Sequence, residues 1–313
     1  MTGAIGVVDL GSNSTNLLVV DGHGVEVERT VAITGMGRGM SADGRLDAAA
    51  RRRVQLQLET YAAALDRHGV PPERRRLVAT AAARMMDPGE RESWFDAIQE
   101  RLGTRPIVLS GPDEGRLAFR GALRTLRSGV TAGTTWLVVD IGGRSTELMW
   151  GEDEPSQVVS LDLGAVSLTE GDLLGDPPRP EELSNAVGRA ADAAADALRD
   201  WPVDLSTATM VGIAGTIVTA AAVEIGLATF DADVLHGFTL TRHAAEDVFR
   251  TLATESLADR VHNPGLPADR ADVIVGGLCI LVAVMRTLRT PALTVSVHNL
   301  LDGVAADVAA AHR

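Results

Sequence analysis

One short pattern occurs twice in this chain and divides it into two halves. In each copy an apolar run ends in an aspartate, a Gly- and Ser-rich turn follows, and a second apolar run comes after the turn. The copies read Asp9-Leu10-Gly11-Ser12-Asn13-Ser14-Thr15 and Asp140-Ile141-Gly142-Gly143-Arg144-Ser145-Thr146. Because the two aspartates are 131 positions apart in a chain of 313 residues, the sequence predicts a duplicated domain.

Apolar periodicity predicts the elements of each half. In the first half we expect strands at Ile5–Asp9, Leu17–Val20, Val25–Ile33, Leu77–Ala81 and Arg105–Leu109. We expect helices at Leu46–His68, Arg91–Leu102 and Pro112–Leu126. A polar boundary segment, Arg127–Thr135, comes next. After it we expect strands at Trp136–Asp140, Glu147–Trp150, Gln157–Leu163, Ala208–Ala214 and Leu293–Val297. We expect helices at Arg179–Arg199, from Gly215 to Gly226, and at Ala244–Thr254, Asp269–Leu288 and Asn299–Ala311. Strands interleaved with helices in two similar halves predict an α/β fold.

The composition excludes several classes of function. The chain contains no lysine, because all 29 basic residues are arginine, so a lysine-dependent P-loop, Schiff-base chemistry and pyridoxal phosphate attachment are excluded. A net charge of −13 and 3% aromatic residues argue against nucleic acid or an anionic membrane as a partner. Any bound anion must therefore be held by backbone N–H groups, hydroxyls, arginine or a metal ion.

The segments that would indicate export or membrane insertion are not visible. No apolar stretch is long enough to span a bilayer, and the chain runs from Met1 into an apolar strand without a signal peptide. The single cysteine, Cys279, cannot form an intramolecular disulfide. We therefore expect a soluble, cytoplasmic protein.

The first turn is a candidate phosphate site. A Gly-rich turn between strands directs successive backbone N–H groups into one concavity, and the hydroxyls of Ser12 and Ser14 add donors. Asp9 stands where it can hold a metal ion or a metal-bound water. An ordinary hairpin turn explains the same residues, since Asp, Gly, Ser and Asn are common in turns.

The second copy of the pattern favours a phosphate site over an ordinary hairpin turn. Two acidic-led turns at equivalent places in two half-molecules can face each other across an interdomain cleft. Asp140 and Glu147 together can hold a divalent cation through oxygen ligands, as magnesium prefers. Alternatively, Asp140 caps the end of a strand and Glu147 lies on the surface.

Two further segments carry weaker signals. Gly215-Thr216 lies between a strand and a helix, where the helix N-terminus can bind an anion. Glu114, in Gly111-Pro112-Asp113-Glu114-Gly115-Arg116, can orient or deprotonate a water, with Arg116 or Arg84 holding phosphate. From this segment alone, helix capping by Pro112, Asp113 and Glu114 is the favoured interpretation.

Taken together, these motifs resemble the exopolyphosphatase/guanosine pentaphosphate phosphohydrolase (Ppx/GppA) family of the actin/Hsp70/sugar-kinase superfamily. The segments that carry the resemblance are VVDLGSNSTNLLVV, VATAAARMM, VLSGPDEGRLAFRGAL, VVDIGGRSTEL, LDLGAVSLTE, VGIAGTIVTAAAV and DRADVIVGGLCIL. They cover nearly the whole chain, whose length suits the short members with two actin-like domains.

The resemblance implies duplicated actin-like (ribonuclease H-like) domains, domain I being 1–127 joined by the C-terminal helix 299–313 and domain II being 128–298. It implies a phosphohydrolase that needs Mg²⁺ or Mn²⁺ and cleaves a terminal phosphoanhydride of polyphosphate, of guanosine pentaphosphate or of another nucleotide. Because so acidic a chain shows no evident channel for a polyanion, we expect short polyphosphate rather than long chains. Glu114 would activate the water, Asp140 and Glu147, with Asp9, would hold the metal, and a homodimer is expected. The phosphate-binding residues would be Asp9, Gly11, Ser12, Asn13, Ser14, Arg84, Gly142, Gly143, Arg144, Ser145, Thr146, Gly215 and Thr216.

Two departures from the family pattern motivate alternatives. Arg144 replaces the third glycine of the second turn, and Asn16 stands where an arginine is usual. These changes fit a nucleotide-binding sensor or regulator without turnover, or a family member redirected to a small phosphorylated metabolite.

Overall fold

The chain forms two compact units in a computed structural model that describes all residues except 1–2, 42, 129, 132, 202–204 and 312–313. The first unit consists of Met1–Gly121 and Leu300–Arg313, and the second consists of Ala122–Asn299. Residues 129 and 132 of the expected boundary segment Arg127–Thr135 lie outside the described residues, as do the ends of the expected 1–127 and 299–313 segments.

The first unit is built on a five-stranded sheet. Its strands are β1 (Ile5–Leu10), β2 (Ser14–Val20), β3 (Glu26–Ile33), β4 (Arg75–Ala79) and β5 (Ile107–Val108). They are ordered β3-β2-β1-β4-β5, with β1, β2 and β3 antiparallel and β4 and β5 parallel to β1. All six residues of β1 are buried, because helices cover both faces of this sheet.

The second unit repeats this topology. Its strands are β6 (Trp136–Ile141), β7 (Thr146–Gly151), β8 (Pro155–Leu161), β9 (Thr209–Ile213), β10 (Thr239–Thr241) and β11 (Ala292–Val295). The order β10-β11-β9-β6-β7-β8 contains β8-β7-β6-β9-β11, which matches β3-β2-β1-β4-β5 strand for strand. The pairing directions match as well, so the predicted duplication of an α/β, ribonuclease H-like domain is confirmed.

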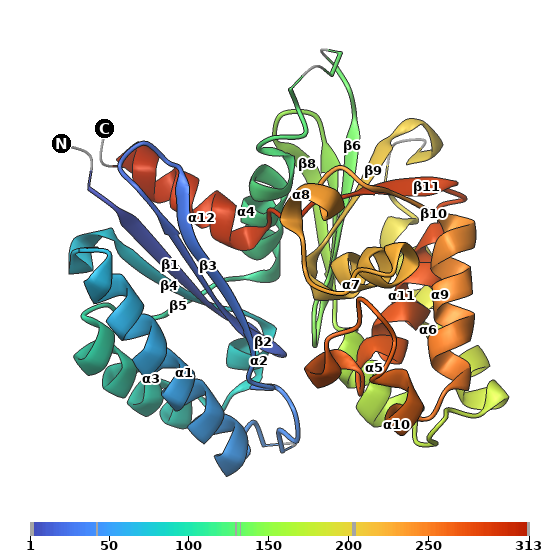
Figure 1. Ribbon diagram of the computed structural model, residues 1–313, viewed down its shortest axis with the longest axis horizontal. Helices are drawn as coiled ribbons and strands as arrows, with labels where there is room; N and C mark the ends of the chain where they lie inside the picture. The colour runs from blue at the N-terminus through green and yellow to red at the C-terminus, as the bar shows by residue number, and fades with distance from the viewer. Residues whose placement is uncertain (1–2, 42, 129, 132, 202–204, 312–313) are drawn as a thin grey trace. The chain divides into compact units, whose positions relative to one another are not determined.

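The helices of the first unit lie on opposite faces of its sheet (Figure 1). They are α1 (Ala48–Arg67), α2 (Ala81–Met85), α3 (Pro88–Leu102), the first part of α4 (Gly111–Leu123) and α12 (Leu300–Ala311). Helices α1 and α3 bury Leu58, Tyr61 and Trp94 in the core, while α12 packs on β1 and β2. Gly303 permits α12 to approach α4 closely, since a Cβ there would lie 2.0 Å from the carbonyl oxygen of Leu117 in α4.

In the second unit, one apolar helix forms the centre of the helical layer. Helix α11 (Ile274–Thr287) is buried from Ile274 to Met285 and packs against α5, α6, α7 and α9. The helices of this unit besides α11 are α5 (Ala165–Asp172), α6 (Pro180–Leu198), α7 (Ala214–Ile225), α8 (Ala232–Leu235), α9 (Arg242–Thr254) and α10 (Leu257–Arg260). Because α11 is apolar on every side, it must be enclosed by other elements.

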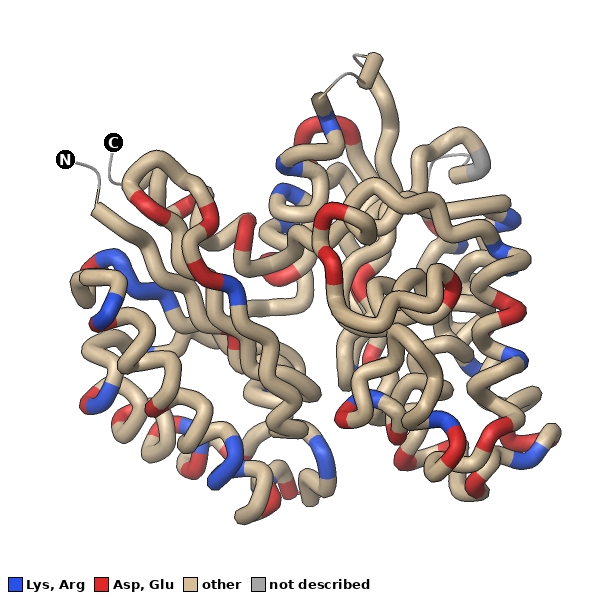
Figure 2. The backbone as a smooth tube through the Cα atoms, in the orientation of Figure 1, with Lys and Arg blue, Asp and Glu red and all other residues tan. Residues whose placement is uncertain are grey.

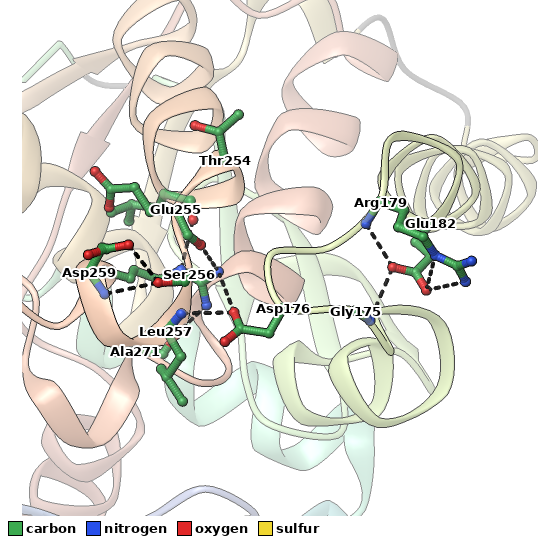
Figure 3. A network of polar contacts seen from close by, with 12 residues as sticks. Gly175, Asp176, Arg179, Glu182, Thr254, Glu255, Ser256, Leu257, Asp259 and Ala271 are labelled. Atoms are coloured by element: carbon green, nitrogen blue, oxygen red, sulfur yellow. Dashed lines mark hydrogen bonds and ion pairs between the residues drawn. The ribbon is translucent and has the colours of Figure 1, made fainter.

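A polar network fixes the loops at the ends of these helices (Figure 3). The buried guanidinium of Arg260 donates to the carbonyl oxygens of Leu252, Glu255 and Ala271 at 2.7–2.9 Å. Asp176 accepts a hydrogen bond of 2.8 Å from the backbone N–H of Leu257. The bonds to Leu252 and Glu255 satisfy carbonyl groups at the C-terminal end of α9 that would otherwise lack donors.

Periodicity missed the shortest elements. Helices α2, α5, α8 and α10 and strand β10 have three to eight residues each, too few for a repeat to be visible in the sequence. The helix expected over Asp269–Leu288 is instead a 3-10 turn, Ala268–Arg270, followed by α11. Among the described residues, no helix is long and apolar enough to cross a membrane.

Charge is distributed unequally between the two units. The first contains 17 arginines and 18 acidic residues, whereas the second contains 12 arginines and 24 acidic residues. Figure 2 marks these positions along the backbone. Nearly all of the net charge of −13 therefore belongs to the second unit.

Candidate active site

The two repeated turns have the same backbone geometry. The N–H of Gly11 donates to the carbonyl oxygen of Ser14 at 3.0 Å, and the N–H of Gly142 donates to that of Ser145 at 3.0 Å. Glycine is required in the first turn, since a Cβ on Gly11 would lie 2.8 Å from the oxygen of Ser14. Each turn thus follows β1 or β6 directly and reverses the chain into β2 or β7.

The next N–H groups in both turns are available to a ligand. Within the described part of the chain, the backbone N–H groups of Ser12, Asn13 and Gly143 donate to no other group. Ser12 and Gly143 occupy equivalent positions of the duplicated turn. Ser12 and Asn13 provide two successive unpaired N–H groups, an arrangement that can bind an anion. The second turn provides the one N–H group of Gly143.

A second layer covers the first turn. The N–H groups of Gly35 and Gly37 donate to the carbonyl oxygens of Asn13 and Ser12 at 2.8 and 2.6 Å. The hydroxyl of Ser12 accepts from the N–H of Ala82, the second residue of α2, at 3.1 Å. The turn is therefore attached both to the segment after β3 and to α2.

Asp9 is buried at the end of β1 with one oxygen unsatisfied. The amide of Asn16, its cross-strand partner, donates to Oδ2 at 3.0 Å, whereas the buried Oδ1 has no hydrogen-bond partner among the described residues. Burial raises the pKa of Asp9 to about 7; the Asn16 bond opposes this rise and the negative charge of Glu114 adds to it. An orphaned, buried carboxylate oxygen is suited to a cation.

Glu114 lies in the first turn of α4 and points into the protein, with 8% of its surface exposed. Its Oε2 accepts a hydrogen bond of 2.7 Å from Nη1 of Arg84, which also donates to the carbonyl oxygen of Leu109. Burial raises the pKa of Glu114, and the Arg84 guanidinium opposes this rise.

The neighbouring residues account for the capping alternative. Ser110 and Asp113 form the cap, because the N–H of Asp113 donates to the Ser110 hydroxyl at 3.2 Å and that hydroxyl donates to the Asp113 carboxylate at 2.6 Å. Arg116 pairs with the exposed Asp113 at 2.9 Å. Of the two arginines considered beside Glu114, only Arg84 contacts it.

The second turn is covered by the start of α5. The N–H groups of Ala165 and Val166 donate to the carbonyl oxygens of Gly142 and Gly143 at 2.9 and 2.7 Å. This approach requires Gly164, since a Cβ there would lie 2.4 Å from the backbone nitrogen of Arg144. The side chain of Arg144 forms an ion pair of 2.8 Å with Glu170 of α5.

Asp140 and Glu147 are directly opposite each other in β6 and β7. Side chains of such a pair project from the same face of a sheet. Glu147 is 1% exposed, and its Oε1 accepts a hydrogen bond of 2.7 Å from Ser160 of β8. Among the described residues, no group of three Asp, Glu, His or Cys side chains is close enough to form a complete metal site.

The strand-to-helix junction at Gly215 is strained and crowded. Ala214 has a φ of 65°, a conformation that side chains other than glycine rarely adopt. The Arg270 guanidinium lies against Gly215, where a Cβ would be 1.6 Å from Nη1. Thr216 is buried, and its hydroxyl faces Gly277 of α11. Sequence reasoning missed Arg270, which comes from a distant segment.

Each unit thus brings together its own part of the predicted site. In the first unit, Ser12 contacts α2, which carries Arg84, and Arg84 contacts Glu114, whose charge also acts on Asp9. The second unit joins Gly142–Thr146, Arg144 and the Asp140–Glu147 pair in one hairpin. The register of Asp140 with Ile213 places the Gly215 junction beside this hairpin.

Comparison with known proteins identifies the family to which the chain is similar. The model of the Ppx/GppA phosphatase family matches residues 17–312. The chain is 36% identical to exopolyphosphatase 2 of Mycobacterium tuberculosis over 97% of this chain and 98% of that protein. It is 30% identical to a guanosine-5'-triphosphate,3'-diphosphate pyrophosphatase of Aliivibrio fischeri, over 95% of this chain and 57% of that protein.

Solved structures show the same fold. A crystal structure of an exopolyphosphatase-like protein matches with a TM-score of 0.91 and 29% identity, over 99% of this chain and 100% of that one. The Aquifex aeolicus member of the Ppx/GppA family matches with a TM-score of 0.81 and 27% identity, over 99% of both chains.

Proposed function

The chain belongs to the Ppx/GppA phosphatase family, and from this premise we propose that it hydrolyses the terminal phosphoanhydride bond of a short polyphosphate or of a nucleotide such as guanosine pentaphosphate. The names of its relatives support phosphoanhydride hydrolysis. The observation that carries the proposal is the buried Glu114 carboxylate, held by Arg84 beside an anion-binding turn.

Glu114 is the group that removes a proton from the attacking water. A general base works best when its pKa is near the working pH, and burial moves the pKa of Glu114 upward in that direction. The Arg84 bond fixes one carboxylate oxygen and opposes this rise in pKa. The Arg84 bond supports a role for this residue in positioning Glu114. Its role as a phosphate ligand stays a prediction.

The repeated turns hold the phosphate groups. The N–H groups of Ser12 and Asn13 in one turn and of Gly143 in the other can donate to phosphate oxygens without any lysine. Because each turn is held by a covering segment, its donors are fixed before substrate binds. Preorganised donors of this kind stabilise the charge that develops on the transferred phosphoryl group.

A divalent cation fits the acidic groups. Each unit by itself offers oxygen ligands of the kind that Mg²⁺ or Mn²⁺ prefers: the unsatisfied Oδ1 of Asp9 in the first unit and the Asp140–Glu147 pair in the second. A bound ion would supply charge neutralisation of phosphate oxygens. Asn16 keeps the other oxygen of Asp9 occupied, so that Asp9 presents a single oxygen.

The charge distribution favours short substrates over long polyphosphate. The second unit has twice as many acidic residues as arginines, and the chain contains no lysine that could line a track for a polyanion. A long chain of phosphates would be repelled outside the turns, at an energy that depends on ionic strength.

Phosphate release by the purified chain tests the proposal. The protein is incubated with Mg²⁺ and tripolyphosphate, long-chain polyphosphate, guanosine pentaphosphate, ATP or a panel of small phosphorylated metabolites. We expect release from a short polyphosphate or a nucleotide, abolished by Glu114→Gln and retained by Asp113→Asn, which removes the exposed neighbouring carboxylate.

The other results point to the alternatives. Release only from small metabolites would indicate a redirected phosphatase. If no substrate is hydrolysed but nucleotide still binds, the chain is a sensor that lacks turnover, and the hydrolase proposal fails.

A further inference from the structure

The first unit contains a counterpart of the Asp140–Glu147 pair. Asp9 is directly opposite Asn16 in strands β1 and β2. Asn16 and Glu147 are 131 positions apart, like the two aspartates, so Asn16 stands in the first hairpin where Glu147 stands in the second. The partners of each pair project from the same face of their sheet. The duplication therefore repeats a pair of oxygen-bearing side chains, with an amide in place of the second carboxylate.

The contacts of the Asn16 amide determine its orientation. Its Nδ2 group donates to Oδ2 of Asp9 at 3.0 Å and to Oγ of Ser14 at 3.1 Å. The reverse orientation would place the amide oxygen against a carboxylate oxygen, and both atoms are acceptors. The Oδ1 of Asn16 is buried and accepts no hydrogen bond from the described part of the chain. Its position is thus fixed by bonds that leave it without a donor.

Two buried oxygen atoms without donors therefore belong to side chains that contact each other. The second atom is Oδ1 of Asp9, a residue with 8% of its surface exposed. A buried acceptor without a partner is unfavourable, and a buried carboxylate without one is more so. Because both side chains meet at the bond between Asn16 and Asp9, one cation with its coordinated water molecules can serve both oxygens.

The charges around Asp9 also favour a cation. Among the described residues, no arginine forms an ion pair with Asp9. The negative charge of Glu114 adds to the effect of burial in raising the pKa of Asp9, and the neutral Asn16 amide opposes this rise. Glu114 differs, since the Arg84 guanidinium donates to it at 2.7 Å. Of these two buried carboxylates, only Glu114 is neutralised by a side chain of its own unit.

We propose that Asn16 is a ligand of a divalent cation and that it forms, with Asp9, a cation site in the first unit. Amide and carboxylate oxygens suit a hard cation such as Mg²⁺ or Mn²⁺, which completes its coordination with water or phosphate. The inference deepens the proposed function and rests on it for the role of the ion, although binding of the ion requires no turnover. Asn16 stands where an arginine is usual in the family, so an exchangeable positive charge here replaces a fixed one.

Binding of Mn²⁺ alone tests this site. The full chain carrying Asp140→Asn and Glu147→Gln, which disable the pair of the second unit, is titrated with MnCl₂, and free Mn²⁺ is followed by electron paramagnetic resonance. We expect this background variant to retain a bound ion. Adding Asn16→Ala should weaken the affinity about ten- to hundredfold, the range for groups around a bound metal ion, and adding Asp9→Asn should abolish binding. A background variant that binds no Mn²⁺ would overturn the proposal.

Asn16→Asp distinguishes a ligand from a positioning residue. This substitution removes the N–H groups that hold Asp9 and supplies a carboxylate oxygen instead, as Glu147 does in the second unit. If Asn16 is a ligand, Asn16→Asp should bind Mn²⁺ more tightly than the background variant, because affinity rises with the charge of the ligands. If Asn16 only positions Asp9, Asn16→Asp should weaken binding as much as Asn16→Ala does, and the proposal fails.

Asn185→Asp is the matched control, because Asn185 is exposed in α6 and the substitution adds the same charge. It should leave the Mn²⁺ affinity within about twofold of the background, since an exposed charge is screened by salt. An equal gain in Asn185→Asp and Asn16→Asp would reduce the effect to net charge and overturn the proposal.

Tm values in EDTA and in Mn²⁺ keep the test valid where a variant folds poorly. If Asn16→Asp is unfolded in EDTA, refolding on addition of Mn²⁺ supports the site, and a failure to refold contradicts it. Wild-type protein that hydrolyses no substrate, with Mn²⁺ still bound by the first unit, would contradict the proposed function alone.

Discussion

Arg84 donates a hydrogen bond of 2.7 Å to the buried carboxylate of Glu114, although 29 residues of chain lie between them. Helix α2 supplies one partner and α4 the other. Burial raises the pKa of Glu114 and this bond opposes the rise. The pair therefore sets the pH at which the carboxylate becomes a base.

Arg84→Gln is expected to move the acidic limb of the kcat/KM profile to higher pH. Without the guanidinium, the pKa of Glu114 rises further, so more alkaline solution is needed to ionise it. Profiles of phosphate release from pH 5 to pH 9 measure this shift. Arg116→Gln is the control, because Arg116 pairs with exposed Asp113, and its profile should coincide with the wild type. If the acidic limb of the Arg84→Gln profile does not move, Arg84 does not affect the ionisation of the catalytic base.

Glu114→Gln is expected to lower kcat by about 10²–10⁴-fold, the contribution of a positioned general base. The amide keeps the shape and can still contact Arg84, so binding of tripolyphosphate should survive. Single-turnover phosphate release and calorimetry on the same preparation measure both properties. Asp113→Asn should retain turnover; a comparable loss there would show that the capping carboxylate matters instead.

The duplication was predictable from the sequence because both copies have apolar runs and turn residues at matching positions. Asp9 and Asp140 align over several consecutive positions, and the two sheets reproduce that alignment in their register. The long helices were also predictable, since Val54, Leu58, Tyr61 and Leu65 recur at helical spacing and are buried. Periodic features of this kind are determined by burial alone.

The parts of the site that depend on short elements were not predictable. Helices α2 and α5 have five and eight residues, so neither shows a repeat, yet they carry Arg84 and Glu170. Arg38, whose guanidinium donates to the side chain of Asn13 on the first turn, lies in an irregular stretch. The glycines of this stretch do not indicate which side chain contacts the turn. At Glu114, capping and catalysis need the same residue type at a helix start. The structure shows that Ser110 and Asp113 form the cap and that Glu114 pairs with Arg84. The catalytic role of Glu114 stays a prediction.

Asp9→Asn is expected to stabilise the metal-free protein above neutral pH while abolishing phosphate release. The native state keeps the Asp9 proton up to about pH 7, whereas the unfolded chain releases it near 3.8, so native stability falls as pH rises through this window. The gain should be small near pH 4 and reach on the order of a few kcal/mol at pH 8. Urea unfolding in EDTA at both pH values measures it.

The fully exposed Asp153 provides the control for this experiment. Asp153→Asn removes the same charge and should leave the free energy of unfolding nearly unchanged. Adding Mg²⁺ should shrink the advantage of Asp9→Asn, because an ion bound by the wild type stabilises only the native state. A variant that is less stable than the wild type at pH 8 in EDTA would contradict the assignment of Asp9 as an uncompensated buried acid.

Glu182→Gln is expected to destabilise the second unit near neutral pH. The Glu182 carboxylate accepts from the backbone N–H groups of Arg179 and Gly175 at 2.8 and 3.2 Å and from the Arg179 guanidinium (Figure 3). These bonds lower the pKa of Glu182 to about 2. The stabilisation is therefore complete above pH 4.5 and is lost as pH falls towards 2.

Thermal unfolding at pH 7 and at pH 3 measures this effect. Glu182→Gln should lower the Tm at pH 7, and its difference from the wild type should narrow at pH 3. Glu181→Gln, at an exposed position beside the same arginine, is the control and should change the Tm little at either pH. A difference for Glu182→Gln that stays constant with pH would attribute the loss to packing rather than to the charged form.

Gly164→Ala is expected to disable the second turn without unfolding the protein. A Cβ at this position would lie 2.4 Å from the backbone nitrogen of Arg144 and from the carbonyl carbon of Gly143, so the turn or the start of α5 must move. The N–H of Gly143 then loses its position, and displacements of this size reduce turnover on the order of a hundredfold. Gly188→Ala in α6 is the matched control, since nothing lies within 4 Å of its added Cβ. Alanine is more stable than glycine in a helix by about 0.5–1 kcal/mol, so this variant should not lose stability.

Rates of phosphate release and Tm values for both variants measure the contrast. Full activity in Gly164→Ala would mean that the second turn tolerates displacement and does not hold a reacting phosphate.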